Sequence, residues 1–158
     1  MMDELDSKAI LLLTENGRLS WAELSQQLGL SAPACADRVR KLEESGVIAG
    51  YSALLNPASF GASLLAFIWV TFGKGKHRKP FQKAIQRTPE ILECHHLAGE
   101  ADFLLKVLVR DTAHLEKLIG GHIRGLPGVL RTRASVVMSS SKDSPLRQMP
   151  RPADSSGS

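Results

Sequence analysis

The first 45 residues carry apolar side chains at intervals of three and four positions, which is typical of helices that bury one face. The apolar face of the first helix comprises Leu5, Ala9, Leu12 and Leu13. Ser20 and Glu23 have the spacing of a capping box at the start of a second helix, and Ser31 is a good N-cap for a third. Each helix ends at a stop signal, in turn Asn16-Gly17, Gly29 and Ser45-Gly46. The pattern therefore predicts three short helices.

Beyond Gly46 the apolar residues fall into short, extended-looking runs at residues 47–51 and 53–55, which end at the turn dipeptide Asn56-Pro57. The remaining pattern predicts a strand, a helix, two strands, a helix and a strand, at residues 64–72, 80–87, 91–97, 103–109, 114–123 and 129–138. This βαββαβ order is typical of a ferredoxin-like, four-stranded antiparallel sheet with two helices on one face. The expected fold class is therefore α+β, a helical N-terminal region followed by this sheet.

The composition is that of a globular protein, with 43% hydrophobic and 23% charged residues among 158. Its net charge of +4 is spread unevenly. Residues 1–50 hold five basic and eight acidic residues, whereas residues 51–138 hold twelve basic and six acidic ones. Because the N-terminal region is acidic, charge alone does not mark it as a nucleic-acid binder.

Several classes of protein are disfavoured. No apolar run approaches the length of a membrane span, and the acidic start at residues 1–6 lacks the basic region of a signal peptide. Cys35 and Cys94 are the only cysteines, so we expect no disulfide framework. We expect a cytoplasmic protein with no membrane partner.

The second and third helices, joined by a short turn that contains Gly29, have the helix-turn-helix pattern. On a helical wheel, Cys35, Val39 and Leu42 form one apolar stripe, so Cys35 is interpreted as a core residue. The opposite side and its flanks present Pro33, Ala34, Asp37, Arg38, Arg40 and Lys41. This division suits a recognition helix, which packs with one side and offers donors to DNA with the other. A generic three-helix bundle with a solvated face has the same pattern.

Longer segments follow one another in a characteristic order. The helical region contains Asn16-Gly17-Arg18-Leu19-Ser20, Glu23-Leu24-Ser25, Gly29-Leu30-Ser31 and Arg38-Val39-Arg40-Lys41-Leu42-Glu43. Later come Gly46-Val47-Ile48, Gly50-Tyr51, Asn56-Pro57, Gly99-Glu100-Ala101-Asp102-Phe103-Leu104-Leu105-Lys106-Val107 and Gly128-Val129. In this order they resemble the Lrp/AsnC family of transcription regulators, the leucine-responsive or feast/famine proteins, over residues 2–150.

The resemblance implies a winged-helix-like helix-turn-helix DNA-binding domain at residues 1–50, an extended hinge at 51–62 and a ligand-sensing and oligomerisation domain at 63–150. The Ser/Pro-rich residues 151–158 are expected to be disordered. The implied protein is a sequence-specific regulator of transcription, not an enzyme, and needs no cofactor. Its implied partners are double-stranded DNA, further copies of itself and a small amino acid that binds where dimers meet. The copies would form a dimer through the sheet and assemble further, commonly to an octamer.

The candidate DNA-binding residues are Ser31, Pro33, Ala34, Asp37, Arg38, Arg40 and Lys41. We expect Arg38 to read a base and Lys41 to contact a backbone phosphate. Small residues at the start of the helix would allow it to approach the DNA closely. For the dimer, we expect Leu65, Phe67, Trp69 and Thr71, or the alternate set of that strand, to face the partner.

The candidate effector-binding residues are Gly99, Glu100, Ala101 and Asp102. Gly99 would expose backbone N–H groups to a carboxylate, and Glu100 or Asp102 would meet the ammonium group of an amino acid. A tight hairpin in which Gly99 and Asp102 serve turn geometry alone is the alternative. The family often has Thr-x-Thr in the last strand, where this chain keeps Thr132 but has Ala134.

Other chemistry has weaker signals. Neither a phosphate-binding loop nor a nucleophile elbow motif is present, which disfavours an enzyme. Cys94-His95-His96 has no further ligands at zinc spacing and is interpreted as ordinary strand, and the basic run at residues 74–79 as a solvated loop rather than a second phosphate contact. The rival function is an amino-acid-sensing regulatory subunit of a metabolic enzyme, without DNA binding. Such a subunit would have no use for a capped, basic recognition helix.

Overall fold

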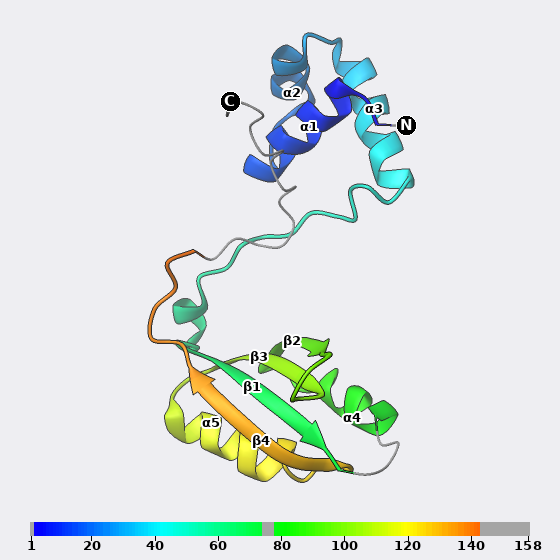
Figure 1. Ribbon diagram of the computed structural model, residues 1–158. Helices are drawn as coiled ribbons and strands as arrows, with labels where there is room; N and C mark the ends of the chain where they lie inside the picture. Colours follow the sequence, from blue (N-terminus) through cyan, green and yellow to red (C-terminus); the bar gives the residue numbers. More distant parts are fainter. Residues whose placement is uncertain (1, 74–77, 143–158) are drawn as a thin grey trace, which may run out of the picture. The chain divides into compact units, whose positions relative to one another are not determined.

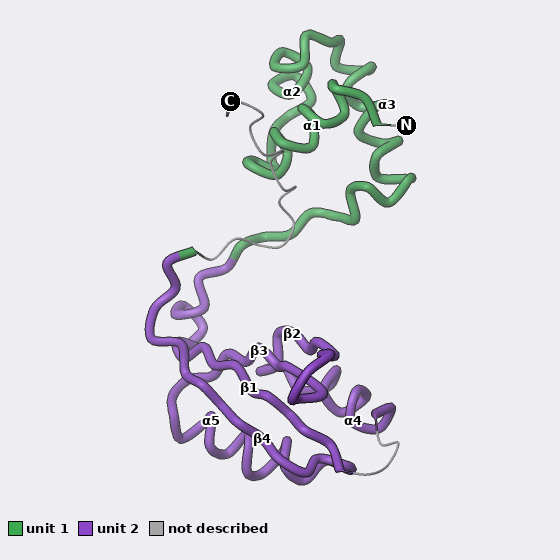
Figure 2. The backbone as a smooth tube through the Cα atoms, viewed as in Figure 1, with its two compact units in different colours: residues 1–54, 142–158 green, residues 55–141 purple. Residues whose placement is uncertain are grey.

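The computed structural model describes residues 2–73 and 78–142 (Figure 1). The chain divides into two compact units, residues 1–54 with 142–158 and residues 55–141 (Figure 2). The division falls inside the segment 51–62, for which we expect a hinge. Residues 74–77 of the basic run and the tail 151–158, expected to be disordered, lie outside the described residues.

The N-terminal unit contains the three helices that the sequence predicts, α1 (Glu4–Glu15), α2 (Trp21–Leu28) and α3 (Ala32–Glu44). Ser20 and Glu23 form the expected capping box on α2, and the Ser31 side chain accepts from the Ala34 backbone N–H at the start of α3. Gly29 ends α2 with a φ of 68°, a left-handed conformation that glycine adopts without steric cost.

A small apolar core joins the three helices. Its fully or nearly fully buried members are Ala9, Leu24, Leu28, Cys35 and Val39. Cys35 is thus a core residue, as expected, and burial raises the pKa of its thiol. After α3 the chain adds Ile48 to this core, but residues 47–55 form no strand.

The second unit has the predicted βαββαβ order in an antiparallel sheet ordered β2-β3-β1-β4. Its strands are β1 (Leu64–Phe72), β2 (Ile91–His96), β3 (Phe103–Val109) and β4 (Val129–Val136). Its helices are α4 (Arg78–Ile85) and α5 (Thr112–Leu118), with a short 3-10 helix at Pro57–Phe60 before β1. Figure 1 shows both α-helices on the same side of the sheet. The predicted fold class is confirmed.

The second helix differs from the prediction of one helix over residues 114–123. Here α5 ends at Leu118 and the chain continues in a wider π-helical turn, η2, from Ile119 to Ile123. Gly120 and Gly121 lie in this turn. Glycine has a low helix propensity because fixing its backbone in a helix costs more conformational entropy than for other residues. Two consecutive glycines therefore disfavour a continuous α-helix here.

The strand β1 is apolar on both faces, and the helices cover only one of them. Ala66, Ile68 and Val70 are fully buried against residues of α4 and α5. The side chains on the opposite face remain partly exposed: Leu65, Phe67, Trp69 and Thr71. Of the two sets that the sequence left open, this one is therefore the set without cover in the single chain. Arg133 of β4 places its guanidinium 4.7 Å from the centre of the Trp69 ring.

Candidate functional site

Helix α3 presents the candidate DNA-binding residues on the side away from the core. Cys35, Val39 and Leu42 are buried, as the wheel predicted. Five of the seven candidates are exposed, namely Ser31, Pro33, Ala34, Arg40 and Lys41. Asp37 and Arg38 are partly exposed. The start of the helix therefore offers small side chains, followed by charged groups one turn later.

Asp37 neutralises part of the positive charge on this face. Its carboxylate accepts from the Arg40 guanidinium and lies 2.8 Å from the Lys41 ammonium nitrogen. These two cations hold the pKa of Asp37 below its usual value. The cluster of three side chains thus carries a net charge of only +1.

Arg38 is held by two carboxylates of α1. Its Nη1 lies 2.6 Å from Asp3 Oδ2 and 2.5 Å from Asp6 Oδ1, and its side chain is 26% exposed. Asp3 and Asp6 also form the capping box that begins α1. Sequence reasoning placed Arg38 among the DNA-binding residues and missed this tie. The spacing of Asp3 and Asp6 indicates a helix cap, but no local signal connects that cap to Arg38. In the single chain, Arg38 connects α3 to the beginning of α1.

The candidate effector segment is the turn between β2 and β3. Asp102 fastens it to β1, because its Oδ2 accepts from Phe72 N at 2.8 Å and its own N–H donates to Val70 O at 2.9 Å. Arg78 lies 3.9 Å from the other carboxylate oxygen. Glu100 is exposed and Ala101 partly exposed.

Gly99 differs from those glycines of this chain that have a positive φ, such as Gly29 and Gly128. It does not adopt a positive φ, and a Cβ built on it would meet no atom within 4 Å. Neither backbone conformation nor crowding within the chain therefore requires glycine at this position.

The other candidates have ordinary partners. Thr132 accepts from Arg124 Nε at 3.0 Å, and Ala134 pairs with Ile68 in the sheet. His95 lies 3.0 Å from Glu93 in the adjoining part of β2. Over residues 2–73 and 78–142, no three metal-ligating side chains gather in a cluster. The same residues include no helix long and apolar enough to span a membrane.

Two family models together match most of the chain. The model described as winged helix-turn-helix DNA-binding matches residues 2–49, and that of the Lrp/AsnC ligand binding domain matches residues 65–146. The chain belongs to the Lrp/AsnC family. Its relatives include the leucine-responsive regulatory proteins of Escherichia coli strain K12 and Klebsiella pneumoniae, each 43% identical over 145 residues, which are 90% of this chain and 88% of the relative.

Solved structures of the family have the same fold. A transcriptional regulator from Neisseria meningitidis in complex with L-methionine is 35% identical, with a TM-score of 0.88 over 90% of this chain and 94% of the other. A feast or famine regulatory protein from M. tuberculosis, also complexed with L-methionine, is 32% identical, with a TM-score of 0.82 over 90% and 96%. The resemblance seen in the sequence is confirmed, and this Lrp/AsnC protein is a DNA-binding transcription regulator.

We expect the tie between α1 and α3 to make the stability of the helical unit depend on pH. Arg38 holds the pKa of Asp3 below 3.8. Ionised Asp3 therefore stabilises the folded state above pH 3.8, and this contribution is lost as the pH falls through the lowered pKa. Denaturant unfolding of the full chain, followed by circular dichroism between acidic and neutral pH, measures the effect.

The Arg38→Gln variant should be less stable than the parent at neutral pH, and the difference should narrow on acidification. Arg18→Gln, a matched change in the same unit, serves as the control. Parallel pH profiles for Arg38→Gln and the parent would show that the tie contributes nothing.

Proposed function

We propose that this Lrp/AsnC regulator binds operator DNA as an assembly of copies and that a small amino acid controls this binding. The observation that carries the proposal is the presence of both units in one chain, a capped recognition helix and a sheet domain matched by the family's ligand-binding model. We propose a cytoplasmic location, because the matched relatives are bacterial proteins and bacterial DNA lies in the cytoplasm. The proposal includes no catalytic role and no cofactor.

For DNA contact we propose the seven residues of α3 named above. Ser31, Pro33 and Ala34 leave room for the DNA backbone at the start of the helix, where the helix dipole favours phosphate. Arg40 and Lys41 would release the Asp37 carboxylate and bind DNA phosphates in its place. A base contact by Arg38 requires its guanidinium to leave Asp3 and Asp6.

For assembly we propose a dimer formed by the open faces of two sheets. The face holds Leu65, Phe67 and Trp69, partly exposed apolar residues on a central strand of the sheet. An antiparallel sheet can leave one face in water when that face is polar, but this face is apolar, and burying it against a second copy would complete its cover. A dimer also brings two recognition helices to one DNA molecule, and avidity then offsets the weak charge of each. Dimers would join into an octamer.

The relatives crystallised with L-methionine suggest that the effector is an amino acid, and we propose that it binds at residues 99–102. Gly99 supports this over the role of turn glycine, because its backbone is open and unstrained. Glu100 is exposed and available to an ammonium group. Asp102, fixed by Phe72 N, would hold the turn in place and offer its remaining lone pairs.

The dimer proposal predicts that Trp69→Lys gives a monomer at micromolar concentration, because a charge would be buried in the interface. Sedimentation velocity measures this, and circular dichroism confirms that the variant is folded. The control is Leu54→Lys, the same change at a residue that is 84% exposed. If Trp69→Lys sediments like the parent, the sheet face is not the interface.

The DNA proposal predicts that substitutions of Lys41 and Asp37 change DNA affinity in opposite directions. Lys41→Ala should weaken binding to all sequences and lower the salt slope by about one. Asp37→Asn should strengthen binding, because it releases Arg40 and Lys41 for phosphates. Gel-shift titrations with DNA from upstream of the chain's own gene, and with a scrambled duplex, give both values.

Arg38→Ala tests the proposed base contact in the same gel-shift assay. Loss of a base contact should cost roughly 1–3 kcal/mol at the operator and relax one base position. Lys83→Ala, on α4, is the control cation. If Asp37→Asn and Lys41→Ala both bind like the parent, this face of α3 does not contact DNA.

The effector proposal predicts that Gly99→Leu abolishes binding of L-methionine without loss of stability. The added side chain would occupy the ligand's space, while the backbone conformation suits any residue. Calorimetric titration and denaturant unfolding measure the two quantities. The control, Gly120→Leu, also places leucine at an unstrained glycine with open space around it. A Gly99→Leu protein that binds L-methionine normally, or that is destabilised, would favour the purely structural turn.

A further inference from the structure

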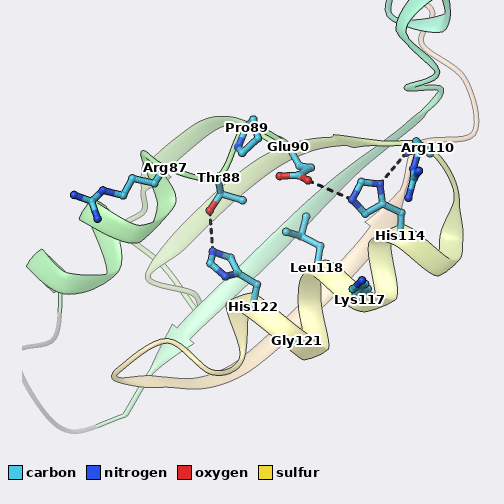
Figure 3. Close-up of a pocket in the computed structure, with 10 residues that line it drawn as sticks. All are labelled: Arg87, Thr88, Pro89, Glu90, Arg110, His114, Lys117, Leu118, Gly121 and His122. Atoms are coloured by element: carbon cyan, nitrogen blue, oxygen red, sulfur yellow. Dashed lines mark hydrogen bonds and ion pairs between the residues drawn. The ribbon is translucent and has the colours of Figure 1, made fainter.

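A pocket of about 470 Å³ lies on the helical side of the second unit, away from the turn at residues 99–102. It is formed by the loop after α4 on one side and by α5 with the turn η2 on the other (Figure 3). Its lining residues come from segments far apart in the sequence, so no local motif marks it. None of the residues proposed above for contact with DNA, the effector or a second copy lines it.

Two polar bridges hold the walls of this pocket together. The Thr88 hydroxyl lies 2.8 Å from His122 Nε2, and His114 Nε2 lies 3.3 Å from Glu90 Oε1. Because the Thr88 hydroxyl donates its only hydrogen to Ala84 O, His122 must be the donor in the first bridge. Figure 3 shows both bridges crossing from the loop to α5 and η2. The loop after α4 is therefore joined to α5 and η2 by two side-chain interactions across the pocket.

The charged side chains around the pocket are mostly positive. Arg87, Arg110 and Lys117 line it, and Glu90 is the one acidic residue among its lining. None of these three cations forms an ion pair with another described residue, whereas Glu90 is engaged by His114. In Figure 3, Arg110 and Lys117 stand at the same end, beside His114. Unpaired cations at a concave site attract an anion.

The turn η2 keeps the pocket open. Gly121 lines the pocket, has no positive φ, and a Cβ built on it would meet nothing within 4 Å. Glycine there is thus required by neither strain nor crowding, and a larger side chain would take up space in the pocket. Wide π-helical turns of this kind occur frequently at functional sites.

We propose that this pocket binds the phosphate groups of a small phosphorylated molecule. The Arg110 guanidinium can donate two parallel hydrogen bonds to phosphate oxygens, and the Lys117 ammonium adds a charge from the same end of the pocket. Thr88 and the two histidines fix the depth and shape of the site. The pocket is a second ligand site, independent of the amino-acid effector.

Calorimetric titration of the full chain with inorganic pyrophosphate tests the proposal. The parent should bind, and Arg110→Gln with Lys117→Gln should weaken binding by about a hundredfold or more, because each of the two lost charge-assisted hydrogen bonds contributes at least about tenfold. Gly121→Leu should abolish binding by filling the pocket. Gly120→Leu, one residue away and outside the lining, should bind like the parent.

Two further measurements separate this site from the others. Gly99→Leu should leave pyrophosphate binding unchanged, so that failure of the effector proposal does not affect the result. In gel shifts, the Arg110→Gln, Lys117→Gln double variant should keep the parent's salt slope. Absence of pyrophosphate binding at millimolar concentration, or a lowered salt slope without such binding, would overturn the proposal, and the second outcome would assign these cations to the DNA backbone.

Discussion

The two faces of β1 constrain the whole second unit. Its apolar side chains point alternately up and down, and α4 and α5 suffice to cover the set at Ala66, Ile68 and Val70. Covering that set fixes the helices on one side, and with them the loop and turn that form the pocket. The other set, which includes Phe67 and Trp69, faces away from the helices. One face of β1 thus positions the helices that form the core and the pocket, and its other face forms the surface proposed for assembly.

In the helical unit, the cations of α3 are paired with carboxylates of the same unit and do not form a strongly positive surface. The arginines and lysine of α3 have carboxylate partners within the same unit, Asp37 for two of them and the α1 capping box for Arg38. In the proposed DNA complex, each of these carboxylates must be exchanged for a phosphate or a base, which lowers the free energy gained from any single contact. We therefore expect such a helix to reject a wrong sequence, which offers fewer contacts, more readily than a helix with unpaired cations would.

The sequence predicted what depends on neighbouring residues. Caps at Ser20 and Ser31, the stop at Gly29 and the strand at residues 64–72 follow from local hydrogen bonding and periodicity, and all were confirmed. It could not predict the partners of Arg38, because Asp3 is 35 residues away and only the packing of α1 on α3 brings them together. For the same reason, the residues lining the pocket are recognisable only in three dimensions.

Because Cys35 is buried, its thiol can react only when α3 separates from the other two helices. Oxidants and alkylating reagents act on an accessible thiolate, and Cys35 has neither exposure nor a lowered pKa. Modification must therefore wait until the three helices separate. The Cys35 thiol is protected from oxidation for as long as the three helices stay packed, and the rate at which a reagent labels Cys35 reports how often they separate.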